Sequence, residues 1–129
     1  MIQFDYIGMV VVTILHFLLG VIWYSPALFK KHWMKAAKIK KMDMSWRHFL
    51  TVLLVGLISG VGMVLVIEYF AITSFPLGLL AGCVLAIAFT LPVIITQELW
   101  ENRSLPLVYI NGAYWLVFLA LSGGLVAVI

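Results

Sequence analysis

The sequence predicts an all-α integral membrane protein, a four-transmembrane-helix up-down bundle with a basic amphipathic interfacial helix between helices 1 and 2. Of the 129 residues, 65% are hydrophobic and only 10% are charged, whereas a soluble domain is about half apolar and about a quarter charged. The apolar residues form four long runs, and positive charge gathers between the first two. A chain this short has too little interior to hide so much apolar surface from water. We therefore predict a single membrane domain over residues 1–129.

Each apolar run is long enough to cross a bilayer as a helix, which takes about 17 to 25 residues. We place the spans at about residues 6–24, 48–69, 75–98 and 105–129. The runs are uniformly apolar, whereas the strands of a membrane barrel alternate and are about half as long. Short connections precede the third and fourth spans, so sequential helices are expected to be antiparallel neighbours. Pro92 lies inside the third span and predicts a kink there.

Positive charge is confined to two short stretches of the chain. Seven of the eight Lys and Arg residues lie between Lys30 and Arg47, and the eighth is Arg103. Cytoplasmic loops of membrane proteins carry the excess of Lys and Arg. We therefore expect a multi-pass protein of the cell (inner or plasma) membrane, with segment 25–47 in the cytoplasm and both termini outside. The same clustering argues against nucleic acid as a partner, despite a net charge of +3.

Segment 25–44 is the one sizeable piece outside the predicted spans. Ser25 and Pro26 are typical of a helix start, and Asp43 or Ser45 is a candidate cap for the next helix. At 100° per residue, apolar side chains gather on one face, and the other face carries Lys30, Lys31, Lys35, Lys38 and Lys41. Such a helix lies in the interface, with its lysines near anionic lipid headgroups. We favour the simpler interpretation that the lysines fix orientation and that the helix connects two spans.

Small residues four positions apart occur in two spans. Gly56 and Gly60 lie in the second span, and Gly78 and Gly82 lie in the third. Such pairs let helix backbones approach closely, which drives association in lipid. We favour packing within the monomer, with self-association as the second interpretation.

His16 falls near the middle of the first span. Ionisable residues inside a membrane are candidates for function, but we favour a neutral histidine hydrogen-bonded to a neighbouring helix. Three histidines are present, His16, His32 and His48, and they fall at different depths without ligand spacing. We therefore expect no metal site and no cofactor.

Glu98 should lie near the cytoplasmic boundary, within reach of Arg103 and of Asn111 in the fourth span. This polar cluster either lines a cavity that opens inward or forms a clasp between the third and fourth helices, and we favour the clasp.

Two blocks of sequence resemble a known family. Residues 20–29, GVIWYSPALF, contain the run Trp23, Tyr24, Ser25 and Pro26, and Trp33 follows shortly after. Together with residues 101–105, ENRSL, and residues 110–114, INGAY, they resemble an uncharacterised bacterial membrane family catalogued as domain of unknown function 1761. The resemblance implies a small four-helix membrane protein and brings no activity. The chain has Asn102 where glycine is commoner in that pattern.

Three classes of function remain open. No nucleophile–base pair, phosphate loop or Cys/His cluster is present, so an enzyme ranks lowest. We favour a non-enzymatic, self-associating or accessory membrane component, with a homo-oligomer or a partner membrane protein expected. The alternative is an oligomeric small-solute transporter or channel, which needs several copies because four spans leave little room for a solute path.

Overall fold

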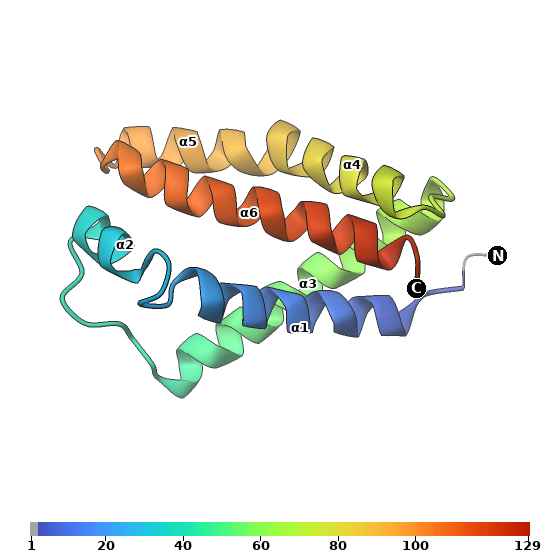
Figure 1. Ribbon diagram of the computed structural model, residues 1–129, viewed down its shortest axis with the longest axis horizontal. Helices are drawn as coiled ribbons and strands as arrows, with labels where there is room; N and C mark the ends of the chain where they lie inside the picture. The colour runs from blue at the N-terminus through green and yellow to red at the C-terminus, as the bar shows by residue number, and fades with distance from the viewer. Residues whose placement is uncertain (1–2) are drawn as a thin grey trace.

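The computed structural model describes residues 3–129, and within that range every regular element is helical. The membrane spans are α1 (Tyr6–Trp23), α3 (Trp46–Tyr69), the continuous run from α4 (Phe75–Leu85) through the π-helical η1 (Ala86–Thr90) to α5 (Leu91–Trp100), and α6 (Leu105–Val126). A short helix, α2 (Lys30–Ala37), lies between the first two spans (Figure 1). All four spans are long and apolar enough to cross a membrane, which confirms the predicted fold class.

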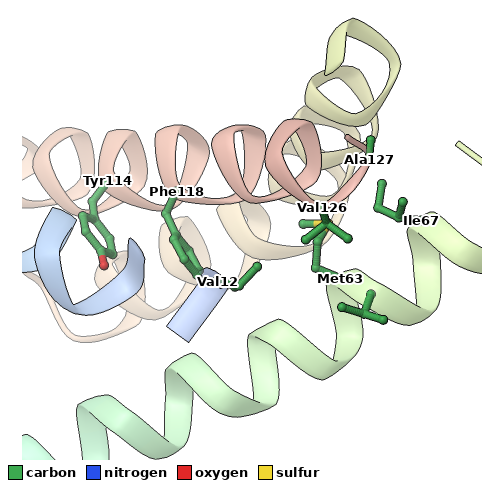
Figure 2. Close-up of a cluster of buried hydrophobic side chains, with 8 residues drawn as sticks. Val12, Met63, Ile67, Tyr114, Phe118, Val126 and Ala127 are labelled. Carbon is green, nitrogen blue, oxygen red and sulfur yellow. The ribbon is translucent and has the colours of Figure 1, made fainter. Parts of the chain in front are cut away.

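The spans pack as two pairs. One pair is α1 on α3, and the other is the α4–α5 run on α6. Contact between α1 and α6 joins the pairs (Figure 1). The core lies at this junction, where Val12 of α1 and Phe118 of α6 are both fully buried. Figure 2 shows these two residues together, with Met63 and Ile67 of α3 near the end of α6.

Glycines set how closely the paired helices approach. A Cβ at Gly60 would lie 2.7 Å from the carbonyl oxygen of Met9 in α1. A Cβ at Gly82 would collide with the carbonyl of Leu119 in α6. Gly56 and Gly78 also face a neighbouring helix at close range. All four glycines singled out in the sequence are therefore used for contacts within the chain. The close approach at Gly56 and Gly60 lets α3 pack on α1, whereas α3 has little contact with α4, the element that follows it in sequence.

The segment before α2 differs from the expectation for residues 25–29. A helix starting at Ser25 and Pro26 is wrong, because α2 begins at Lys30 and has no side-chain cap. Ser25 instead donates a hydrogen bond to the carbonyl of Ile22 at 2.6 Å, closing the end of α1. The chain then turns back so that the rings of Phe29 and Trp23 lie 4.9 Å apart. The predicted cap at Ser45 is confirmed, since its hydroxyl accepts from the N–H of His48.

The third span is interrupted one turn before the predicted kink site. Residues Ala86–Thr90 form a π-helical turn, in which the N–H of Leu91 reaches back to the carbonyl of Ala86. Pro92 has no N–H, and its ring excludes the carbonyl four residues earlier. The wider turn accommodates that ring without ending the helix.

Candidate functional site

One end of the bundle carries all of the positive charge. The basic end consists of α2, residues 38–47 and the loop 101–104, and it contains all eight Lys and Arg residues. The opposite end carries Asp5 and Glu68. Asp5 accepts a hydrogen bond from the N–H of Gly8, and its own N–H donates to Glu68 Oε1 at 2.9 Å. The two acids thus tie the start of α1 to the end of α3.

A cavity of about 1030 Å³ lies inside the basic end. Here the spans form an open arc, since α5 packs on α6, α6 on α1 and α1 on α3. The edges of the arc, α3 and α5, line opposite sides of the cavity, and α2 lines its outer end. The wall is mainly apolar and includes Phe17, Val21, Phe49, Val52, Ile94 and Trp115. Its size and lining are typical of a site for a small molecule.

His16 and Tyr114 form the deep end of this cavity. Both are buried, with 7% and 4% of their surface exposed. The hydroxyl of Tyr114 lies 2.8 Å from His16 Nδ1 and 2.9 Å from the carbonyl oxygen of the same residue. Trp115 and Phe118 surround the imidazole at centroid distances of 5.6 and 4.8 Å. The histidine is therefore held by α6, and the fully buried Phe118 and Val12 close the bundle beyond it.

The two sequence blocks that resemble a known family meet on the cavity wall. Trp23 Nε1 donates to the carbonyl of Ile110 at 3.1 Å. Beside it, the Tyr24 hydroxyl donates to Asn111 Oδ1 at 2.7 Å. Burial raises the pKa of Tyr24 to about 12, so the phenol is a neutral donor at ordinary pH. The ring of Trp33, from α2, lies 5.2 Å from that of Tyr24. These contacts fix the junction of α1 and α2 against α6.

Glu98 lies on the opposite wall, on α5, and is 8% exposed. Its Oε2 atom makes no hydrogen bond among residues 3–129 and lies 3.6 Å from Arg103 Nε. Arg103 also lies 3.0 Å from Glu101. Glu98 therefore pairs with the loop after its own helix, whereas Asn111 is bonded to Tyr24. Glu98, Arg103 and Asn111 all line the cavity, as one of the two interpretations of this cluster expects, and no hydrogen bond or ion pair among residues 3–129 joins Glu98 to Asn111.

The six lysines of segment 25–44 divide into two sets. Lys30 and Lys41 line the cavity, while the residues that do not are Lys31, Lys35, Lys38 and Lys40. Lys38 ends α2 with a φ of 56°. The loop after α5 is tied to α2 through Ser104, whose hydroxyl donates to the carbonyl of Ala36 at 3.1 Å. The backbone N–H of Ser45 lowers the pKa of Asp43, which is not among the residues that line the cavity.

The sequence marked one further residue of the site only through the family resemblance and gave no functional signal for two others. Tyr114 belongs to the resembling block 110–114, whereas Trp115 and Gln97, which also line the cavity, were not singled out. Among residues 3–129, no three His, Cys, Asp or Glu side chains are grouped closely enough to hold a metal ion. The site therefore offers a mainly apolar cleft with His16 and Tyr114 at its deep end, Glu98 and Asn111 on its walls, and Lys30 and Lys41 at its outer end.

The model of one protein family matches residues 7–127, nearly the whole chain. That family is described as a protein of unknown function, DUF1761, so the match brings membership without an activity. No curated protein and no solved structure shows a significant match to the chain. The family match covers nearly the whole chain, and the two sequence blocks that resemble the family contact each other in the fold. The chain belongs to the family of proteins of unknown function DUF1761.

Proposed function

We propose that this multi-pass membrane protein is a non-enzymatic component that binds a small membrane-associated molecule in the cavity at its basic end. One observation carries the proposal: the polar residues His16, Glu98 and Asn111, which come from three different spans, all line the same cavity. Placing polar groups at membrane depth is costly. A packed bundle of this size has no structural need for a cleft of about 1030 Å³.

The closed floor of the cavity supports binding rather than an open channel. Beyond His16, the fully buried side chains of Val12 and Phe118 fill the space between α1 and α6. A ligand entering from the basic end therefore stops at the histidine. Glu98 Oε2 supports the same proposal, because it lies 3.6 Å from Arg103 Nε but accepts no hydrogen bond among residues 3–129, and a ligand or water can supply that donor.

A plugging substitution tests the binding proposal. Val52 of α3 lines the cavity, while its neighbour Leu53 is 44% exposed on the outer face of the same helix. Native mass spectrometry of protein purified in mild detergent should detect a bound small molecule in the wild type and in Leu53→Trp. Val52→Trp should lose it while keeping the helical circular dichroism signal. Equal occupancy in all three proteins, or a bare wild-type protein, would contradict the proposal.

Transport is the second candidate, and the depth of His16 within the first span supports it. A transporter built on this cavity needs several copies or a second conformation that opens the floor between α1 and α6. Solute flux in liposomes should then vanish in His16→Ala or Glu98→Gln while folding persists. Unchanged flux in both variants would remove these residues from any pathway.

Self-association remains part of the proposal. Gly62 supports it, because this exposed glycine of α3 has open space where a Cβ would stand, beside the 72% exposed Ile58. A small residue on an outer apolar face lets a second helix approach closely. Light scattering in mild detergent should show a defined homo-oligomer that Gly62→Leu weakens. A strictly monomeric, partner-free protein would contradict this property.

We further propose that the basic end faces the cytoplasm, with both termini outside the cell membrane. Confinement of all eight Lys and Arg residues to that end supports this orientation. In this placement α2 lies in the membrane interface, and its lysines help to fix the orientation of the chain. Reporter fusions within residues 38–44 should report a cytoplasmic location, and an external location would reverse the orientation.

A further inference from the structure

We propose that the occupant of the cavity is an anionic phospholipid taken sideways from the surrounding bilayer, with its headgroup at Lys30 and Lys41 and an acyl chain between α3 and α5. This inference rests on the binding function proposed above and names its ligand class. It also gives Lys30 and Lys41 a role in headgroup binding that the remaining lysines of segment 25–44 do not share.

The route of entry follows from the arc of helices. At the basic end, α3 and α5 are the two edges of the arc, and both are parts of membrane spans. Val52 and Ile94 line the cavity from these two edges. The opening between them therefore faces hydrocarbon, and an acyl chain reaches it without leaving the bilayer. A water-soluble solute has no corresponding access through this side.

Charge at the rim selects the headgroup. Lys30 and Lys41 line the outer end of the cavity, and neither has a carboxylate within ion-pair distance among residues 3–129. The one carboxylate that lines the cavity, Glu98, already lies beside Arg103. The uncompensated charge at the rim is therefore positive. A phosphate with net negative charge matches it, whereas a zwitterionic headgroup brings its own cation into the same space.

Aromatic residues at the same level fit the boundary between a headgroup and its chains. Tyr24 and Trp33 line the cavity next to Lys30, and their rings lie 5.2 Å apart. Aromatic side chains with one polar edge prefer the height at which lipid headgroups meet hydrocarbon. The rest of the wall is mainly apolar, with Glu98 and Asn111 among its polar exceptions and His16 at the deep end. The order of basic rim, aromatic collar and apolar cleft repeats the order of groups along a phospholipid.

The test compares two double variants of the same charge change. Lys30→Gln with Lys41→Gln removes the rim, and Lys31→Gln with Lys35→Gln removes two exposed lysines that do not line the cavity. Each full-length protein is reconstituted in nanodiscs that contain phosphatidylcholine and phosphatidylglycerol. Lipid retained after release is counted by native mass spectrometry. Circular dichroism and a single elution peak establish that each variant folds.

The wild type should retain one lipid molecule and should prefer phosphatidylglycerol to phosphatidylcholine by about 30-fold. This preference corresponds to ~2 kcal/mol for two lysines. The rim variant should lose that preference, and the control variant should keep it. Excess inorganic phosphate should not displace the lipid, because the chain as well as the headgroup is bound. Displacement by phosphate would identify a free anion site and overturn the lipid assignment.

The remaining outcomes separate this inference from the binding function on which it rests. Equal loss in both double variants would show attraction to the whole basic surface and overturn the rim assignment. Equal retention of both lipids, still abolished by Val52→Trp, would overturn the anionic preference and leave the binding function standing. If Val52→Trp left the retention of lipid unchanged, both the lipid assignment and the proposed binding function would be overturned.

Discussion

The hydroxyl of Tyr114 faces two polar atoms of His16 at once, Nδ1 at 2.8 Å and the backbone carbonyl oxygen at 2.9 Å. A phenol has one proton to donate. The carbonyl is an acceptor only, so the phenol proton goes to it, and Nδ1 must then carry the proton of the second bond. Among residues 3–129, Nε2 of His16 has no hydrogen-bond partner, which leaves it as the acceptor at the cavity floor.

Tyr114→Phe should destabilise the protein by about 1–3 kcal/mol, because it leaves the Nδ1–H of His16 buried without a partner. The matched control is Tyr109→Phe on the same helix, where the side chain is 67% exposed and a change near zero is expected. Denaturant unfolding in detergent measures both. Nitrogen-15 NMR of the wild-type histidines should show one ring protonated at Nδ1. A ring protonated at Nε2 would contradict the proton assignment.

Stability should fall at high pH through Tyr24. Burial raises its pKa to about 12, whereas the unfolded phenol titrates near its ordinary value of 10.0. A raised pKa in the folded state means that the stabilisation is complete below pH 10 and is lost as the pH rises toward 12. The phenolate also loses the proton that Tyr24 donates to Asn111. Unfolding free energy measured between pH 9 and 12 should therefore decline more steeply in the wild type than in Tyr24→Phe.

Absorbance of the phenolate gives an independent check on the same residue. The Tyr24→Phe protein should lack a late fraction of the titration seen in the wild type. Identical titration curves for the two proteins would show that Tyr24 is solvated and would remove the pH prediction.

Gly82→Ala should be among the most damaging small changes in the spans. A Cβ at this position collides with the backbone of Leu119, which cannot move as a flexible side chain does. The α4–α6 contact must then widen, at a cost of about 1–3 kcal/mol. Gly20→Ala is the control, because its Cβ would make an ordinary contact 3.6 Å from the Tyr114 hydroxyl. Thermal unfolding should rank Gly82→Ala well below Gly20→Ala, and equal melting would contradict the packing account.

The number, type and approximate limits of the spans were predictable because a bilayer demands long apolar helices. The pairing of helices was predictable only in part: the first two spans pack together and so do the last two, as expected for sequential neighbours, but α3 has little contact with α4. That choice depends on which glycine faces which backbone, as Gly60 does with Met9. A sequence shows the small residues but not the helix rotation that brings them together.

The site was predictable only in parts. His16, Glu98 and Asn111 stood out as polar residues in apolar spans, but their shared cavity depends on the splay of α3 from α5. The predicted start of α2 at Ser25 and Pro26 was wrong, because the hydroxyl of Ser25 bonds to the end of α1 instead. Asn102 is explained by its φ of 53°, a left-handed conformation that asparagine tolerates and glycine adopts freely.

The last prediction concerns the ion pair between Glu98 and Arg103 at the end of α5. Arg103→Gln leaves the carboxylate of Glu98, which is 8% exposed, without its neighbouring cation. Removing one partner of a buried pair costs more than removing both. We expect Arg103→Gln to destabilise the protein by about 2 kcal/mol. The double variant with Glu98→Gln should recover much of that loss, because the uncompensated charge is gone.

Glu101 provides the matched control for this pair. Its side chain is 57% exposed and lies 3.0 Å from Arg103, closer than Glu98 at 3.6 Å. If proximity alone set the energy, Glu101→Gln would cost more than Glu98→Gln. Because water screens the exposed pair, we expect Glu101→Gln to cost less than about 1 kcal/mol. Denaturant unfolding of the four proteins measures the coupling. If the double variant were no more stable than Arg103→Gln, the loss of stability in Arg103→Gln would not come from leaving the buried carboxylate of Glu98 without a cation.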